Sequence, residues 1–168
     1  MIIHGEKRIL GNKDSFAIQY ELTDVFNQFI TGKICYWIQG RQIGKYEEIL
    51  LSDILLFLPT IIKDSGNRIH EIFFDMEPRK LVYLLSGAAF LENNAEVEKK
   101  ANEEQWARFN LSVPLDVLGT VSLYQIDSIE NTRLILIDDK GECFQAYIEK
   151  ECVDKVYLQL YNELIAYC

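Results

Sequence analysis

Apolar and polar residues alternate with a period of two near both ends of the chain, and this pattern predicts strands. The segment SFAIQYEL (15–22) places its aromatic and branched residues on one face, as a half-buried strand does. Three later segments continue as an antiparallel meander: TVSLYQI (120–126), TRLILID (132–138) and ECFQAYI (142–148). The strands therefore form an N-terminal group and a C-terminal group.

Residues 32–47 predict a hairpin within the N-terminal group. Gly40 is the first central residue of the four-residue turn 39–42, and a type II′ turn favours glycine there. Counting outward from this turn pairs Ile38 with Ile43 and Trp37 with Gly44. We therefore expect the Trp37 ring to pack over a glycine on the neighbouring strand.

A period of 3.6 residues predicts helices between and after the strands. Ser52 is a candidate N-cap for a helix that Pro59 interrupts and Gly66 ends, and Pro78 lies in the first turn of a second helix. Residues 93–105 are helix-permissive but have little apolar surface to bury. The clearest amphipathic stripe lies in the final segment, 151–168, which must dock on another element.

The alternation resumes at residues 107–115 and leaves Trp106 and Arg108 on the face opposite the apolar one. Two interpretations are open. Either a helix covers that face, so that Trp106 is part of the core and Arg108 pairs with a buried acid, or the face is exposed and binds a protein partner. Tryptophan and arginine are enriched at interface hot spots, although tryptophan is more often buried.

These elements predict an α+β fold in a single domain over residues 1–168, because strands and helices are grouped rather than alternating. We expect an antiparallel sheet built from the N-terminal hairpin strands and the C-terminal meander. Two central helices and the C-terminal helix should pack against it.

Composition narrows the class of protein. The chain has 168 residues, 49% of them hydrophobic, so it is long enough to bury a core and too apolar to be disordered. Its net charge is −9, and residues 46–168 carry all of the excess, which disfavours nucleic-acid binding. We find no signal peptide and no membrane span, and the four cysteines lack zinc or disulfide spacing. We expect a cytoplasmic protein with reduced thiols.

No catalytic or metal-binding motif survives inspection, so we expect no cofactor, no metal and no enzyme activity. His70 and Glu71 begin an HExxH pattern, but position 74 is phenylalanine. Adjacent carboxylates such as Glu103 and Glu104 diverge on a helix or strand and do not converge on one substrate. A Cys35/His70 dyad is a chance combination in a chain with four cysteines and two histidines, and His4 has no ligand partner nearby in the sequence.

Several phrases in order carry a family resemblance: SFAIQYEL, GKICYWIQGRQIGKYE, LLSDIL, IIKDSGNR, FFDM and EEQWARFNLSVPLD. Together, from about residue 12 to residue 116, they resemble the immunity 42 family of bacterial polymorphic-toxin systems. The resemblance implies a small cytoplasmic protein that binds and neutralises a toxin. The family's hallmark residues, matched onto this chain, are expected to be structural: Trp37, Gly40, Gly66, Trp106 and Arg108.

The expected partner is therefore a cognate toxin domain, for example a basic nuclease, bound by a monomer of this chain. The acidic run 92–104 is the candidate contact surface, and its carboxylates are Glu92, Glu96, Glu98, Glu103 and Glu104. The alternative for this run is a solvated helix without a partner. The alternative functions are a small hydrolase that uses carboxylates or Cys35, and a non-inhibitory adaptor or scaffold domain.

Overall fold

The computed structural model describes residues 5–168, so His4 lies outside the described residues. Contacts divide the chain into two compact units. Unit 1 comprises Met1–Ser65, Val113–Thr120 and Glu151–Cys168, and unit 2 comprises Gly66–Ser112 and Val121–Lys150. Each unit has its own sheet and is described separately, and the single-domain organisation stays a prediction.

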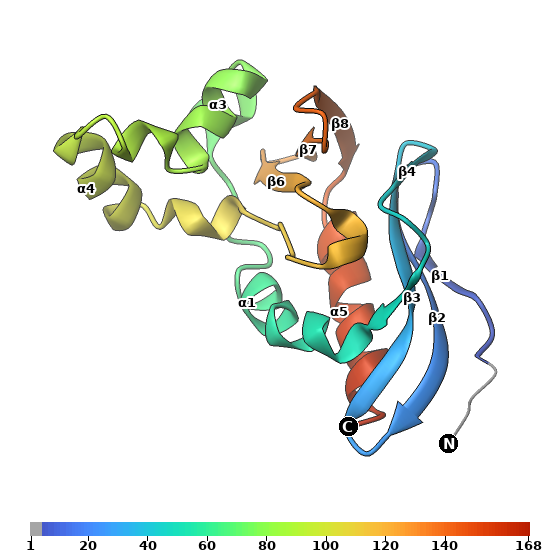
Figure 1. Ribbon diagram of the computed structural model, residues 1–168. Helices are drawn as coiled ribbons and strands as arrows, with labels where there is room; N and C mark the ends of the chain where they lie inside the picture. The colour runs from blue at the N-terminus through green and yellow to red at the C-terminus, as the bar shows by residue number, and fades with distance from the viewer. Residues whose placement is uncertain (1–4) are drawn as a thin grey trace. The chain divides into compact units, whose positions relative to one another are not determined.

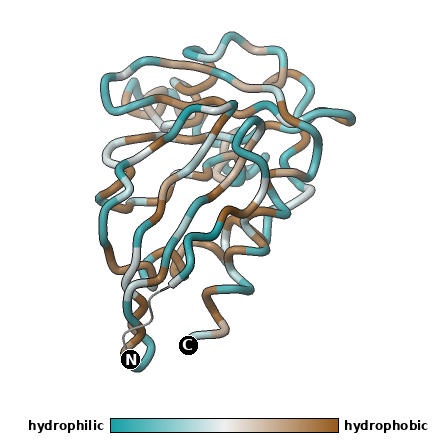
Figure 2. The backbone as a smooth tube through the Cα atoms, turned by 90° about the vertical axis from the view of Figure 1, so that its right-hand side faces the viewer, coloured by the Kyte–Doolittle hydropathy of each residue, from teal (hydrophilic) through white to brown (hydrophobic). Residues whose placement is uncertain are grey.

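Unit 1 is built on an antiparallel sheet of five strands (Figure 1). The strands are β1 (Arg8–Gly11), β2 (Phe16–Phe26), β3 (Phe29–Ile38), β4 (Arg41–Ile43) and β5 (Glu48–Leu50). Strands β2 and β3 form the long central hairpin, β1 pairs with the outer edge of β2, and the two short strands share the other edge of β3. Along these strands the chain alternates between apolar stretches and polar residues, as the colouring by hydropathy in Figure 2 shows.

The turn between β3 and β4 differs from the type II′ turn predicted above. Ile38 pairs with Arg41 rather than with Ile43, so the two central residues are Gln39 and Gly40. Both have positive φ, 48° and 78°, which is the conformation of a type I′ turn. A non-glycine residue in the left-handed region is uncommon, and this is why the pattern alone placed the turn one residue too late.

The shifted turn changes the surroundings of Trp37. Its cross-strand neighbours are Gln42 on β4 and Ala17 on β2, so the predicted contact with Gly44 is wrong. The indole Nε1 donates a hydrogen bond to the side-chain oxygen of Gln19 at 3.2 Å. Trp37 is thus held on the sheet by packing against a small residue and by one polar contact.

The helical elements of unit 1 are the 3₁₀ helices η1 (Leu51–Leu56) and η4 (Asp116–Leu118) and the α-helices α1 (Leu58–Lys63) and α5 (Cys152–Ile165). The predicted break near Pro59 is present, because η1 ends at Leu56 and α1 begins at Leu58, directly before the proline. Ser52 does not cap a helix; its hydroxyl accepts a hydrogen bond from the Ile30 backbone N–H at 3.3 Å. The sequence pattern thus correctly predicted the interruption of the helix at Pro59, but its prediction that Ser52 is the N-cap is wrong.

Helix α5 docks on this sheet, with contacts to β1, β2 and α1 (Figure 1). Its buried residues include the predicted stripe members Val153, Val156, Leu160 and Leu164. The Tyr157 ring meets the rings of Phe16 and Tyr36 at centroid distances of 5.8 Å and 6.2 Å. Burial raises the pKa of Tyr36 to about 12, so its hydroxyl stays neutral within the core.

Unit 2 combines a three-stranded antiparallel meander with short helices. Its elements are α2 (Glu71–Asp75), α3 (Pro78–Leu85), η2 (Ala88–Phe90), α4 (Ala95–Glu103), η3 (Trp106–Phe109), β6 (Ser122–Asp127), β7 (Asn131–Ile137) and β8 (Cys143–Glu149). The meander is confirmed, and α3 begins at Pro78 with the Glu77 carboxylate accepting the N–H groups of Arg79 and Lys80. The pattern of apolar and polar residues did not predict the short helix α2.

The core of unit 2 lies between the helices and β6–β7. The rings of Phe73, Trp106 and Phe109 pack edge to face, with Phe73 at 5.1 Å from Trp106 and 5.6 Å from Phe109. Leu81 and Ile126 complete this contact without exposed surface. Aromatic edge-to-face packing adds to the stabilisation from burial.

Residues 106–109 form η3, so the strand predicted from residue 107 onward is wrong at its start. Gln105 has a φ of 54°, which turns the chain before the tryptophan. Ala107 is exposed, whereas Phe109, Leu111 and Val113 are buried as the alternation predicted. The alternate burial is real, but most of it belongs to an extended segment rather than a strand.

The α+β class is confirmed. The N-terminal strands and the meander, expected in one antiparallel sheet, form two antiparallel sheets, one in each unit. Within residues 5–168, no strand pair connects the two sheets. Each sheet packs against helices of its own unit, so the two groups of strands do not have to share one sheet.

Candidate functional site

Helix α4 and the turn before it form an acidic surface, which we define by Glu92, Glu96, Glu98 and Glu103. All four residues are exposed. The side chain of Asn94 caps the helix by accepting the Val97 N–H at 3.3 Å. The opposite face packs on the unit 2 core through Val97 and Ala101, so this orientation leaves the carboxylates in solvent.

Two lysines compensate part of this charge. Lys99 lies 3.8 Å from Glu103, and Lys100 lies 3.8 Å from Glu104, both at i,i+4 spacing. Exposed pairs of this kind contribute about 0.3–0.5 kcal/mol and leave the carboxylates hydrated. The remaining excess of negative charge lies in and before the first turn of α4. There it also interacts favourably with the positive end of the helix dipole.

Glu104 differs from the other four predicted carboxylates because it binds side chains of the unit 2 core. Its Oε2 accepts a hydrogen bond from Trp106 Nε1 at 2.8 Å and lies 3.4 Å from His70 Nε2. The Trp106 hydrogen bond, followed by the His70 contact and Lys100, lowers the pKa of Glu104 despite some desolvation. Glu104 thus closes a polar cluster at the edge of the core.

His70 has a structural position in the same cluster. Its Nδ1 accepts the Phe73 N–H at 3.1 Å and caps α2, and its ring stacks on Phe73 with centroids 3.8 Å apart. Because Nδ1 accepts this hydrogen bond, the proton of the neutral ring lies on Nε2, facing Glu104. Cys35, the other member of the pair considered above, belongs to unit 1 and is fully buried, and burial raises its pKa. A raised pKa disfavours the reactive thiolate.

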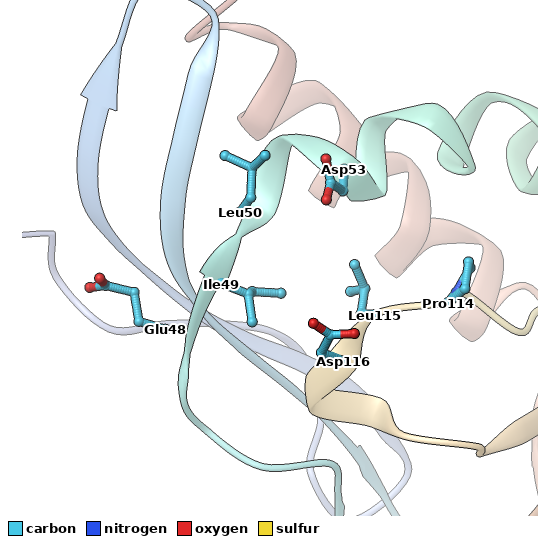
Figure 3. Close-up of a pocket in the computed structure, with 7 residues that line it drawn as sticks. All are labelled: Glu48, Ile49, Leu50, Asp53, Pro114, Leu115 and Asp116. Atoms are coloured by element: carbon cyan, nitrogen blue, oxygen red, sulfur yellow. The ribbon is translucent and has the colours of Figure 1, made fainter.

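Unit 1 contains a small acidic pocket between β5, η1 and the segment that leads into η4 (Figure 3). The pocket has a volume of about 240 Å³. Figure 3 shows the carboxylates of Asp53 and Asp116 on its two sides, with Ile49 and Leu115 between them and Glu48 directed away. This pair was not among the predicted site residues, because 63 positions separate the two aspartates in the sequence.

Within residues 5–168, no group of three or more histidine, cysteine or acidic side chains is arranged to hold a metal ion. Over the same residues, none of the helices is long and apolar enough to span a membrane.

Comparison with known proteins identifies the family. The family model described as Immunity protein 42 matches residues 1–163 of this chain. The chain belongs to the immunity protein 42 family. Membership supports a toxin-neutralising immunity role of the kind that the resemblance implied.

A solved structure shares the fold of this immunity-family chain. The crystal structure of CdiI from Burkholderia dolosa AUO158 aligns with a TM-score of 0.70 at 16% identity, covering 93% of this chain and 99% of that one. At such low identity the likeness concerns the fold alone. No curated protein matches the sequence.

Three of the residues matched to the family's hallmark positions meet in unit 2. Arg108 donates from Nε to the carbonyl of Asn67 at 2.7 Å and from Nη1 to the carbonyls of Glu104 and Gln105. Asn67 follows Gly66, whose φ of 76° turns the chain after α1. Trp106, 7% exposed, packs against Phe73 in the core of the same unit. Arg108 therefore binds backbone carbonyls of two turns. Of the two interpretations left open by the sequence, the burial of Trp106 agrees with the one that places it in the core.

The other two, Trp37 and Gly40, lie on the β3–β4 hairpin of unit 1. The Lys13 ammonium lies 3.9 Å from the centroid of the Trp37 ring, and the backbone N–H of Gly40 donates to the carbonyl of Lys13 at 2.7 Å. The hairpin tip is therefore fastened to the loop between β1 and β2. Each of the five matched positions makes a contact or forms a turn within its own unit, and their structural role stays a prediction.

Proposed function

We propose that this chain neutralises a cognate bacterial toxin by binding it stoichiometrically in the cytoplasm, as a monomer and without a catalytic step. The observation that carries this proposal is the family match over residues 1–163. The burial and raised pKa of Cys35 support binding over thiol chemistry, because the thiolate is the nucleophilic form.

The acidic surface of α4 is the proposed contact for a basic toxin, for example a nuclease. Glu92, Glu96 and Glu98 are exposed, and within residues 5–168 none of them forms an ion pair with a lysine. Lys100, four residues after Glu96, pairs with Glu104 instead. Opposite charges across an interface accelerate encounter more than they strengthen the final complex. Fast capture matters for an inhibitor that must act before its toxin damages the cell.

Within this surface the five predicted carboxylates have different roles. Glu103 is exposed and pairs with Lys99, and Glu104 binds Trp106 and His70. We therefore assign Glu104 to the support of the surface and the other four glutamates to the contact itself. A test of the contact should leave Glu104 intact, because its replacement also changes the unit 2 core.

Co-expression tests the function. The expected partner is the C-terminal toxin domain of a large secreted protein encoded immediately upstream of this chain's gene, and this domain is expressed in bacteria with the chain and without it. We expect growth arrest when the toxin domain is expressed alone and survival when the chain is present. Survival that does not depend on the chain, or arrest despite its expression, contradicts the proposal.

Association kinetics test the α4 surface. Replacing Glu92, Glu96 and Glu98 with glutamine should slow association with the toxin domain several-fold at low salt, and the difference should vanish near 0.5 M salt because screening removes it. A control replaces the exposed Glu130 with glutamine and Asp139 with asparagine. An on-rate equal to that of the wild type at low salt rejects this surface.

A further inference from the structure

Beside the acidic pocket of unit 1 lies an apolar groove, defined by Phe29, Leu50, Leu55 and Leu56. The groove has a volume of about 280 Å³ and shares Leu50 and Asp53 with the acidic pocket. One continuous surface thus combines an apolar floor with a carboxylate pair. All of its residues belong to unit 1.

The apolar side chains of this surface are unusually open to solvent. Leu56 is 75% exposed, Phe29 is 51% exposed, and Phe26, which pairs with Phe29 across the hairpin, is 65% exposed. Paired residues on adjacent strands project from the same face of a sheet, so the two phenylalanines lie together. Grouped exposed apolar side chains with a polar rim are typical of a protein-binding site.

The charge of this surface indicates what kind of partner it accepts. Segments 46–62 and 113–120, which line most of it, contain Glu47, Glu48, Asp53 and Asp116 and neither lysine nor arginine. Unit 1 contains twelve acidic and eight basic residues in all, so these four equal its whole net negative charge. Within residues 5–168, the carboxylates of Asp53 and Asp116 have no hydrogen-bond or ion-pair partner. Both are therefore available to a cation from a binding partner.

The dimensions of the two hollows match side chains rather than a metabolite. Pockets for small molecules usually hold about 300–1,000 Å³, and the volumes of about 240 and 280 Å³ lie below that range. One hollow is acidic and the other apolar, so the pair fits two neighbouring side chains of different chemistry.

We propose that the toxin docks on this surface through a segment that presents lysine or arginine beside an apolar side chain. The basic side chain enters the acidic pocket between Asp53 and Asp116 (Figure 3), and the apolar one covers Phe29 and Leu56 in the groove. This inference rests on the proposed function and adds the site at which the complex is anchored. The α4 surface sets the rate of encounter, whereas the groove, which loses its water on binding, sets the rate of dissociation.

Surface plasmon resonance with an inactivated form of the upstream-encoded toxin domain tests the anchor. Leu56→Glu places a charge in the groove and should raise the dissociation rate by about 30-fold, the effect of losing one hot-spot residue. Ile129→Glu is a matched control, because Ile129 is 74% exposed and belongs to unit 2. It should change the rate less than twofold.

A second variant tests the acidic half of the surface without inserting a new charge into the groove. Asp53→Asn combined with Asp116→Asn should raise the dissociation rate about tenfold and reduce its dependence on salt. Both side chains are exposed, and we expect both variants to keep the wild-type unfolding midpoint in urea.

The outcomes separate this inference from the proposed function. If both groove variants dissociate like the wild type and still neutralise the toxin, the anchor is wrong and the function stands. If the wild-type chain does not bind the toxin domain, both are wrong. If light scattering shows a wild-type dimer that Leu56→Glu converts to a monomer, the groove holds a second copy of this chain and the toxin anchor is overturned.

Discussion

Arg133 on β7 allows the sharpest prediction about stability. It is 2% exposed, and its Nη1 donates to the carbonyls of Phe73, Phe74 and Met76 at 3.1, 2.8 and 2.7 Å. Its Nε and Nη2 donate to the side-chain oxygen of Gln145 at 2.9 and 2.6 Å. One buried guanidinium thus binds the carbonyl end of α2 to two strands.

Replacing Arg133 with methionine keeps an unbranched apolar side chain but removes the guanidinium and all of these hydrogen bonds. A buried acceptor left unpaired costs about 1–3 kcal/mol, and three carbonyls and one amide oxygen are affected. Methionine also removes the desolvated charge, which offsets part of this cost. We expect a loss of about 3–5 kcal/mol from the free energy of unfolding, with unit 2 affected first.

The two tryptophans make the assay specific to a unit, because Trp37 belongs to unit 1 and Trp106 to unit 2. In a Trp37→Phe background, urea unfolding followed by Trp106 fluorescence should show a midpoint lowered by about 1.5–2.5 M, taking a slope of about 2 kcal/mol per molar urea. The control Arg79→Met replaces an exposed arginine whose guanidinium donates to the Gly141 carbonyl at 3.4 Å.

The control should change stability by less than about 0.5 kcal/mol, as exposed substitutions usually do. If Arg133→Met also stays within about 1 kcal/mol of its background, the buried guanidinium does not support unit 2, and the reasoning from its hydrogen bonds is refuted.

Three further predictions concern single side chains. Asn94→Ala removes the cap of α4 and should cost about 1 kcal/mol, measured by urea unfolding. Because the pKa of Glu104 is lowered in the folded state, its contribution is present above the ordinary carboxyl pKa of about 4.3 and is lost as the pH falls through its folded pKa. The stability gap between wild type and Glu104→Gln should therefore narrow between pH 6 and pH 3.5. Gly44→Ala should cost at least about 3 kcal/mol, because φ is +87° and the new Cβ would lie 2.7 Å from a Leu118 methyl group, whereas Gly66→Ala, with φ +76° and open space around it, should cost about 1–2 kcal/mol.

Each of these has an outcome that contradicts it. An Asn94→Ala protein as stable as the wild type means that the α4 cap is not needed. A gap for Glu104→Gln that widens in acid contradicts the sign of its pKa shift. Equal costs for the two glycine substitutions contradict the role assigned to the close contact at Gly44.

Periodicity predicted the elements that bury one face and expose the other. The stripe of α5 and the meander strands β6, β7 and β8 follow directly from spacing, because a continuous apolar face must meet a partner. The acidic character of α4 was equally visible, since a helix with little apolar surface must lie outside. The type I′ turn at Gln39 was missed because its positive φ occurs at a residue that only rarely adopts it.

The unpredicted features depend on residues that are distant in sequence. Arg68 and Arg133 are buried because backbone carbonyls from other elements reach them, and composition alone places arginine at the surface. The pocket between Asp53 and Asp116 likewise exists only after folding. One feature of the sequence did indicate the groove. Leu55 and Leu56 lie outside the apolar stripe of their helix, so the helix has more apolar residues than its buried face requires.

The most direct test of the central claim is a titration of toxin activity in vitro. A fixed concentration of the upstream-encoded toxin domain, well above the dissociation constant, is mixed with increasing amounts of this chain, and the residual activity is measured at once and after an hour. Stoichiometric binding predicts that activity falls linearly to zero at one equivalent and does not change with time. Activity that persists at tenfold excess, or that disappears progressively at a small fraction of one equivalent, contradicts neutralisation by binding.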